Sequence, residues 1–409
     1  MENRSQKVPP ALILQAQKAM NSIASSLRRE ARRLAADPWD LAMVTWVPLL
    51  GVALLWWIFS AGLPRHLAVG VVDDDHSSLS RQLVRMLDAT PGVQITQHFT
   101  NAAEAERALR AVDVYAVVSI PRDFARTVKE GRAAQVTLLH NAQMSTHSGL
   151  LQRDVRTAVG TLSAGVEMAA RNKRGESAQA VHVSMEPIHT QMVALFNVSS
   201  NYEQFLGAAL IPALLHILAM TAGAWTVGRE LRDRTLGEWL GAGGWVRTAG
   251  ALVGKLALPW ATLTLVGLLA LVGITWGRGW HPPGNLWWVA AALALLMAVS
   301  ITAGAALAGI TRSLRTALSG AGFFAAPAFA FSGVAFPLSG MPGSARAWAE
   351  AMPFTHYIRL QIEQLQMGAP VATSVSTMVA LTIATAGLWL VGATALTVAH
   401  TRPDTWGGR

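Results

Sequence analysis

The sequence predicts an α-helical membrane protein with six transmembrane helices and an extracytoplasmic α/β domain inserted between helices 1 and 2. Of its 409 residues, 52% are hydrophobic and only 14% are charged, whereas an average soluble domain carries roughly 25% charged residues. The uncharged residues are gathered into runs of about 20 or more, enough to cross the hydrocarbon core as helices. Short basic clusters between these runs follow a positive-inside pattern.

Residues 1–40 are polar and basic, and they do not have the pattern of a cleavable signal peptide. Within them, residues 10–36 carry apolar residues on one helical face and end in a basic cluster. This pattern predicts a cytoplasmic amphipathic helix that lies in the membrane interface. An ordinary surface helix on a partner is the alternative. The basic cluster consists of Arg28, Arg29, Arg32 and Arg33.

The first uncharged run covers residues 41–61, and we assign 41–63 to transmembrane helix 1. If the N-terminus is cytoplasmic, the arginines that flank the later runs fall on the cytoplasmic side, so both termini are predicted to be cytoplasmic. The remaining five helices are predicted within residues 205–409, at about 205–227, 249–276, 286–310, 316–335 and 374–399.

Residues 64–204 form the predicted extracytoplasmic domain. Strand-like runs alternate with helix-like segments through most of it, which predicts an α/β fold. A long helical stretch, about 145–172, is expected to lead back to the membrane. The run Asp73-Asp74-Asp75 ends a strand and is expected to begin a helix cap, which needs no calcium. The strand-like runs are 67–75, 93–96, 114–121 and 134–141.

Several classes of chemistry are disfavoured by composition. Without cysteine the chain has no disulfide, thiolate metal site or cysteine nucleophile. The histidines of the extracytoplasmic region lack metal-ligand spacing, and no catalytic arrangement is apparent. We therefore expect no catalytic residue, metal or cofactor in this chain. The formal net charge of +9 is expected to reflect cytoplasmic loops and not a nucleic-acid partner.

The chain also lacks an ATP-binding signature. The nearest approach, Gly250 to Lys255, has one residue too few between its glycines and no Ser or Thr after the lysine. The predicted spans are almost free of ionisable groups, which disfavours ion-coupled transport. His216 and Lys255 are the main exceptions. A lone histidine in a span is more often a helix–helix hydrogen bond than a proton relay.

Three stretches carry a resemblance to a known family. The first is the insertion, through its opening (71–87) and its core (117–141). The second is 195–217 leading into 225–240, and the third, 336–370, has proline, aromatic and methionine residues at fixed positions. Together with the layout, they resemble the ABC-2 type transporter permeases, in the subset with a large extracytoplasmic domain after the first span. Val198 stands where that family often has proline, and Arg234 where glycine is usual before Thr235.

The resemblance implies the permease subunit of an ATP-binding cassette exporter in the bacterial inner membrane, which is not itself an enzyme. A separate cytoplasmic nucleotide-binding ATPase subunit would hold ATP and Mg. The other expected partners are a second permease copy or paralogue, the lipid bilayer and a periplasmic adaptor protein. The nearly uncharged spans suit a hydrophobic or amphiphilic small molecule or lipid as cargo.

The loop 228–247 is expected to couple the permease to the ATPase. It holds a compact set of charges beside Gly241, Gly243 and Gly244, which favour turns. The alternative is that these charges are solvated flanks of the membrane spans. The predicted coupling residues are Arg229, Glu230, Arg232, Asp233, Arg234, Thr235 and Glu238.

The segment 336–370 is expected to form a re-entrant pair of short helices at an outer gate. Its prolines interrupt helix, and irregular backbone at membrane depth is tolerated only inside protein or along an aqueous cavity. An ordinary surface loop is the alternative. The predicted gate residues are Phe336, Pro337, Met341, Pro342, Pro353, His356 and Tyr357.

Two other functions stay open at this point. One is a polysaccharide or polymer exporter permease, which the large extracytoplasmic domain disfavours. The other is a membrane-anchored receptor or scaffold with an extracytoplasmic binding domain. A neighbouring gene for an ATPase would favour transport, and its absence would favour the receptor.

Overall fold

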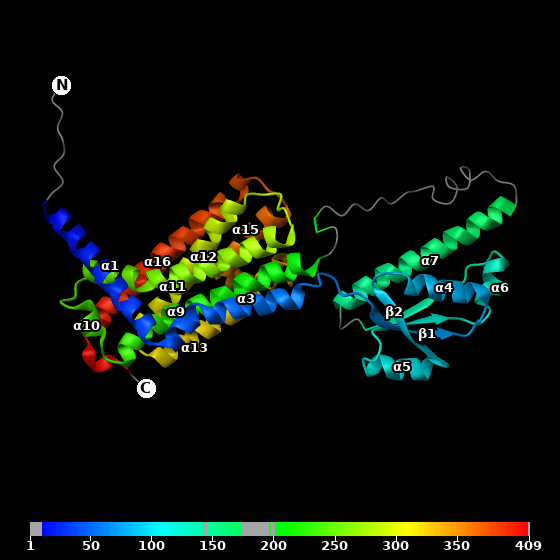
Figure 1. Cartoon of the computed structure of the whole chain (residues 1–409), viewed down its shortest axis with the longest axis horizontal. Helices are drawn as coiled ribbons and strands as arrows, with labels where there is room; N and C mark the ends of the chain where they lie inside the picture. Colours follow the sequence, from blue (N-terminus) through cyan, green and yellow to red (C-terminus); the bar gives the residue numbers. More distant parts are fainter. Residues whose placement is uncertain (1–9, 142–144, 174–195, 198–200, 408–409) are drawn as a thin grey trace, which may run out of the picture. The chain divides into compact units, whose positions relative to one another are not determined.

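The computed structural model describes residues 10–141, 145–173, 196–197 and 201–407. The chain divides into two compact units, which are described separately (Figure 1). The helical unit comprises Met1–Gly62 and Ala194–Arg409, and the sheet unit comprises Leu63–Val193.

Among the described residues of the helical unit, five helices are long and apolar enough to cross a membrane, and they correspond to five of the six predicted spans. The first is made of two short helices, and a π-helical turn, Glu203–Gly207, precedes the second. Figure 1 shows α1, α10 and the C-terminus at one end of this bundle, here called the α10 end, and α15 at the other. The long helices are α2–α3 (Pro38–Val44 and Trp46–Phe59), α9 (Ala208–Arg232), α11 (Trp245–Ile274), α12 (Leu286–Thr311) and α16 (Val375–His400).

The run 316–335 does not form a helix of that length, so the count of six spans is not met among the described residues. Helix α13 (Leu314–Ala325) has 12 residues, or about 18 Å at 1.5 Å per residue, against about 30 Å of hydrocarbon. A 3-10 turn, Ala326–Ala328, follows, and Gly333 has a φ of +87°. Pro327 lacks the N–H that would continue the helical ladder. The low charge of 316–335 therefore indicates an apolar segment, but the backbone of this segment turns and does not continue as one long helix.

Shorter helices and turns complete the helical unit. α1 occupies the range predicted for the N-terminal helix. α14 and α15 lie within the predicted 336–370 pair of short helices, and a π-helical turn follows α15. The elements are α1 (Pro10–Ala36), α10 (Leu236–Leu240), α14 (Gly343–Ala351), α15 (Pro353–Gln361), the π turn Ile362–Gln366, and the 3-10 turns Trp276–Arg278, Leu338–Gly340, Val371–Ser374 and Pro403–Thr405.

Helix α1 packs closely against α11 because α11 offers glycines at the crossing. A Cβ atom on Gly250 would lie 2.8 Å from the carbonyl oxygen of Ala19, and one on Gly254 would lie 2.2 Å from that of Ile23. Small residues four apart allow two helix backbones to approach in this way. The glycines that fail as a phosphate loop thus serve helix packing. The buried positions of α1 recur every fourth residue, at Ser22, Ser26, Glu30 and Leu34.

A second close crossing joins α9 to α12. A Cβ on Gly223 would lie 1.9 Å from the carbonyl oxygen of Ile301, and one on Gly304 would lie 1.9 Å from that of Met220. Only glycine fits at such distances without moving the backbone. These two helices form the centre of the bundle.

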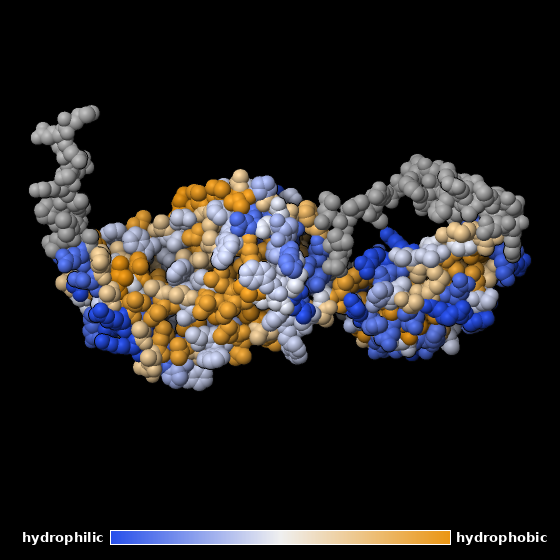
Figure 2. Space-filling model, turned by 45° about the horizontal axis from the view of Figure 1, so that its top comes forward, coloured by the Kyte–Doolittle hydropathy of each residue, from blue (hydrophilic) through white to orange (hydrophobic). Residues whose placement is uncertain are grey.

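The outer surface of the helical unit is apolar along its sides, and hydrophilic residues gather at its end near α1 (Figure 2). Large apolar side chains are left uncovered there, including Trp57 at 75%, Phe323 at 67% and Ile383 at 66% exposure. A soluble domain would bury most of such surface. This distribution suits a bundle surrounded by lipid.

The sheet unit holds four strands in the order β2-β1-β3-β4, with β1 parallel to β2 and β3, and β4 antiparallel to β3. One face packs through Val69 and Val71 against α4 and α7, and the other through Val72 and Val117 against α5. Figure 1 shows these helices on opposite faces. The elements are β1 (Leu67–Asp73), α4 (Ser78–Asp88), β2 (Val93–Phe99), α5 (Ala102–Arg110), β3 (Ala116–Ile120), α6 (Phe124–Lys129), β4 (Thr137–His140) and α7 (Ser145–Lys173).

The run of three aspartates that begins at the last residue of β1 does not supply the cap of α4. That cap is Ser77, whose hydroxyl oxygen accepts from the backbone N–H of Ser80. Asp73 instead accepts from the backbone N–H groups of Asp75 and His76, which closes the turn between the strand and the helix. Ser77 occupies the N-cap position of α4, and Asp73 accepts hydrogen bonds in the turn that precedes it.

The α9–α12 crossing predicts that Gly304→Val destabilises the bundle. A Cβ at this position overlaps backbone, so the helices have to separate, at a cost of about 1–3 kcal/mol or more. We expect the thermal midpoint of the purified protein in detergent to fall by about 5 °C or more. The control is Gly322→Val in α13, where a Cβ meets no atom within 4 Å. Equal midpoints for the two variants would contradict this packing.

Candidate functional site

A fully buried lysine lies between helices α1, α9 and α11. The side chain of Lys255, on α11, has 0% exposure, and its Nζ lies 3.0 Å from Oε2 of Glu30 and 2.5 Å from Oε1 of Glu230. Those carboxylates come from α1 and α9 and are themselves 0% and 5% exposed. Three helices far apart in the sequence therefore meet at one ammonium group.

Lys255 supplies one positive charge for two carboxylates, and arginines of α1 neutralise the remaining negative charge. Arg29 forms a two-pronged pair with Glu230, with both N–O distances at 3.0 Å. Arg33 donates to Glu30 at 3.2 Å and to the carbonyl oxygen of Thr226 at 3.3 Å. The hydrogen bond to Glu230 raises the pKa of the Arg29 guanidinium, which stays charged. Two-pronged arginine pairs fix geometry as well as charge.

Asp40, at the start of the first span, extends the cluster. Its carboxylate, 5% exposed, accepts from Arg33 at 2.9 Å and from the indole N–H of Trp225 at 2.9 Å, and it also pairs with Arg229. The site therefore holds three carboxylates and four cationic groups. We call this set the charge cluster, and it comprises Arg29, Glu30, Arg33, Asp40, Arg229, Glu230 and Lys255.

Burying these charges is expensive, and the arrangement explains how the fold tolerates it. Removing a charge from water costs several kcal/mol, and the attraction between partners offsets this only when each group is well paired. Here Glu230 receives Lys255, Arg29 and the hydroxyl of Thr235. The cluster therefore contributes little net stability, but separating its members would leave a buried charge uncompensated. It holds α1, α2, α9 and α11 in one arrangement.

The chain leaves α9 through a tight turn in which Arg234 adopts a left-handed conformation, with a φ of +59°. The N–H of Thr235 donates to the carbonyl oxygen of Glu230, which closes a glycine-type helix end. Glycine adopts this conformation without strain. This accounts for the glycine that the resemblance led us to expect at this position.

Helix α10 is anchored to α1 and to the charge cluster. The indole N–H of Trp239 donates to the hydroxyl of Ser26 at 2.9 Å, and the Lys255 ammonium lies 5.2 Å from the centre of the Trp239 ring. Leu236 and Leu240 are buried beside it. Around this anchor a group of charges faces outward, which we call the exposed rim. It consists of Arg232, Asp233 and Glu238, with side-chain exposures of 48%, 41% and 70%.

The predicted coupling residues thus divide into two groups. Arg229, Glu230 and Thr235 lie in or against the charge cluster, and the rest of the set lies toward the rim. Arg29 connects the groups, because it also lies 3.5 Å from Glu238. Of the four predicted arginines of α1, Arg29 and Arg33 join the cluster. The other two, Arg28 and Arg32, are exposed.

Sequence reasoning missed Glu30, Asp40 and Trp239, and it singled out Lys255 without a partner. A signal was present, because a charge inside or next to an apolar run requires an opposite charge nearby. Asp40 directly precedes the uncharged run 41–61, and Lys255 lies in the third span. Which acid pairs with which base depended on tertiary packing.

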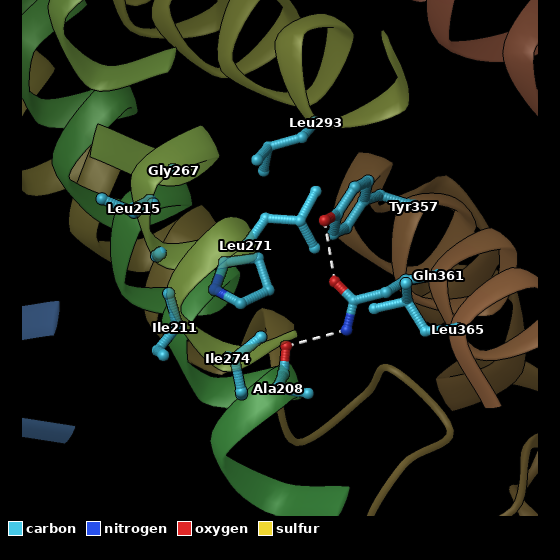
Figure 3. A pocket seen from close by; sticks show the side chains of 12 residues that line it. Ala208, Ile211, Leu215, Gly267, Leu271, Ile274, Leu293, Tyr357, Gln361 and Leu365 are labelled. Atoms are coloured by element: carbon cyan, nitrogen blue, oxygen red, sulfur yellow. Dashed lines mark hydrogen bonds between the residues drawn. The ribbon is translucent and has the colours of Figure 1, made fainter. Parts of the chain in front are cut away.

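At the α15 end, the 336–370 segment supplies a polar contact to α9 (Figure 3). Pro212 lacks the N–H that would bond to the carbonyl oxygen of Ala208. The side-chain amide of Gln361 donates to that oxygen at 2.8 Å, and the hydroxyl of Tyr357 donates to Gln361 at 2.7 Å. The adjoining cavity of about 20 Å³ has room for one water molecule. α15 thus stabilises a helix that a proline would weaken.

The other predicted gate residues range from partly exposed to exposed. Pro353 begins α15, and Pro342 directly precedes α14. The ring of His356 bonds to the carbonyl oxygen of Glu350 at 2.7 Å. Phe336 is 52% exposed. Pro337 is exposed and Met341 is partly exposed.

A third buried acid that sequence reasoning missed lies near the same end. Glu203, 5% exposed, pairs with Arg278 at 3.0 Å and accepts from the indole N–H of Trp56 at 2.6 Å. Arg278 also donates to the carbonyl oxygen of Ser60. These contacts join the ends of α3, α9 and α11.

A bundle with five membrane-length helices and ionic groups gathered toward its ends defines a multi-pass membrane protein. The chain belongs to the ABC-2 family of transporter proteins, because the model of that family, described as "ABC-2 family transporter protein", matches residues 38–394. The resemblance predicted from the sequence is thereby confirmed. A comparison with curated proteins found no match.

Family membership makes the chain an ABC transporter permease, which implies an ATPase partner. The matched region contains Asp40, Arg229, Glu230 and Lys255 of the charge cluster. It begins after α1, so Arg29, Glu30 and Arg33 lie outside it. The cluster therefore joins the matched helices to the N-terminal helix of this chain.

The charge cluster predicts that Lys255→Met is strongly destabilising. The change removes the cation between Glu30 and Glu230, and breaking a buried ion pair from one side costs about 3–5 kcal/mol. We expect a lower thermal midpoint in detergent, with partial recovery when Glu30→Gln is added. The control is Lys18→Met, which makes the same change at an exposed position of α1. A Lys255→Met protein as stable as this control would be inconsistent with a buried ionic site.

Proposed function

We propose that this chain is the permease subunit of an exporter that moves a hydrophobic or amphiphilic small molecule or lipid out across a bacterial inner membrane. A separate cytoplasmic ATPase binds ATP and Mg and supplies the energy. Two permeases, either identical copies or paralogues, form the pathway. The spans support an apolar cargo, because their few ionisable groups are paired near the helix ends or occur singly, as His216 does.

The observation that carries this proposal is the charge cluster with its exposed rim. The rim residues Arg232, Asp233 and Glu238 offer both signs of charge to a docking partner. Trp239 and Arg29 connect α10 and the rim to buried groups of α1, α9 and α11. A displacement of α10 by the ATPase therefore carries these helices with it, since separating them would expose unpaired charges to an apolar interior.

The proposed topology places the α10 end in the cytoplasm and the sheet unit in the periplasm. Arginines concentrate at the α10 end, as the positive-inside rule requires of a cytoplasmic face. They include Arg28 and Arg32 on α1, Arg312 directly after α12 and Arg315 in the first turn of α13. Both termini are then cytoplasmic, and the sheet unit is free to bind a periplasmic adaptor.

Reversal of a rim charge tests this proposal. We expect the affinity-tagged chain, extracted in mild detergent, to recover an ATPase, and Glu238→Lys to reduce that recovery by about tenfold or more, because like charges then face each other. Glu238 is chosen over Glu230 because its side chain is 70% exposed, so its reversal removes the 3.5 Å contact with Arg29 but changes none of the buried carboxylates.

The matched control is Glu350→Lys on α14, an exposed position at the other end of the bundle. It should recover the ATPase as the unmodified chain does, with an unchanged thermal midpoint for both variants. Equal recovery with Glu238→Lys would rule out the rim as the docking surface. No ATPase with any form of the chain would contradict the exporter itself.

A further inference from the structure

A cavity of about 560 Å³ in the helical unit is lined by residues of α9, α12, α13, α14, α15 and α16. It belongs to neither the charge cluster nor the contact between α15 and α9. Small-molecule sites commonly have about 300–1,000 Å³, an apolar lining and a few placed polar groups. The lining is formed mainly by apolar side chains, among them Met220, Leu307, Phe324, Trp348, Met352 and Leu388.

The space exists because small residues face each other across it. α12 contributes Ala303 and Ala306, and α16 contributes Ala384 and Gly387. A Cβ added to Gly387 would meet no atom within 4 Å. On another side Phe324 and Trp348 stack with ring centres 5.6 Å apart. The cavity therefore has room for a flat or chain-like apolar molecule beside an aromatic wall.

Two polar side chains, His216 and Ser300, line this apolar cavity. His216 is 4% exposed, and its Nδ1 lies 2.6 Å from the hydroxyl oxygen of Ser300. That hydroxyl has a single proton, which it donates to the carbonyl oxygen of Leu296. The Ser300 oxygen is therefore an acceptor toward the ring, and Nδ1 of His216 carries the proton of this hydrogen bond.

The second ring nitrogen of His216 is then the unprotonated one. No acidic side chain lines the cavity to balance an imidazolium, so the neutral ring is favoured, and its Nε2 is an acceptor. Within the described part of the chain, the hydrogen bond of His216 is made through Nδ1, and the residue lines the cavity. An acceptor nitrogen on a residue that lines an apolar cavity among membrane-spanning helices indicates a place for a ligand group.

We propose that this cavity binds an apolar molecule of drug-like size that donates one hydrogen bond, from a hydroxyl or an N–H group, to Nε2 of His216. The contact between His216 and Ser300 fixes the ring, and the apolar walls hold the body of the ligand. Describing the ligand as the exported cargo rests on the proposed function. A membrane-resident amphiphile of the same chemistry would fill the same site.

Photolabelling tests the site. The full chain in lipid nanodiscs is irradiated with 4-(hydroxymethyl)benzophenone or with its methyl ether, which cannot donate a hydrogen bond. We expect label on Met220 and Met352, which line the cavity and have reactive side chains. Half-saturation should occur at a roughly three- to tenfold lower concentration for the hydroxyl probe, the range of one net hydrogen bond.

His216→Phe should abolish the preference for the hydroxyl probe, and His216→Gln, which keeps an acceptor, should retain part of it. Gly387→Phe should suppress labelling of both methionines by filling the cavity. Gly322→Phe makes the same change on α13 at a residue that does not line the cavity, and it should label normally. Label spread evenly over lipid-facing residues, or an unchanged preference in His216→Phe, would overturn the proposal.

The source of the ligand is decided with the ATPase-bound complex. Loss of the methionine label on addition of ATP supports a site that releases cargo, and unchanged label supports a resident amphiphile. Both results require the cavity to bind the probe. Labelling of the isolated chain does not depend on the ATPase, so a failure of the exporter proposal would leave this result standing, and the reverse also holds.

Discussion

A lysine ammonium inside a helical bundle has to be neutralised where it lies, and Lys255 is neutralised by carboxylates from two other helices. Glu30 and Glu230 then need further cations, which Arg29 and Arg33 provide from α1. The arrangement of α1, α9 and α11 follows from this requirement, because a rearrangement that moved one of these helices alone would leave a charge unpaired in an apolar interior. The rim and α10 are attached to the same group of residues, so charge pairing joins the exposed surface to the spans.

Close backbone approach is the second constraint, and it works together with the first. Gly250 and Gly254 bring α1 against α11, which places Glu30 within reach of Lys255. Gly223 and Gly304 do the same for α9 and α12. Farther along α12 and α16, small residues do not meet a neighbouring backbone. They leave open volume there, which forms the apolar cavity beside His216. Small residues thus produce tight crossings where helices meet and open volume where they diverge.

The sequence allowed the long helices to be predicted well because hydrocarbon imposes a simple rule on length and charge. The same rule failed at 316–335, since an uncharged run can turn at Pro327 as easily as it can continue. The charge cluster was predicted only in part. Glu230 and Arg29 were chosen for their positions in a loop and a basic helix, but their pairing joins residues 201 positions apart. Neither that pairing nor the place of His216 beside a cavity leaves a local pattern in the sequence.

Because shared charges join them, α1 and the α10 rim are expected to move as one body when the ATPase binds ATP. Because the chain has no cysteine, single pairs of spin labels can be introduced at exposed positions. In the ATPase-bound complex, the distance between labels at Met20 and Glu238 should be the same with and without ATP. The distance between labels at Met20 and Ser339, in the 336–370 segment at the other end of the bundle, should change. A Met20–Glu238 distance that shifts with ATP would contradict the account.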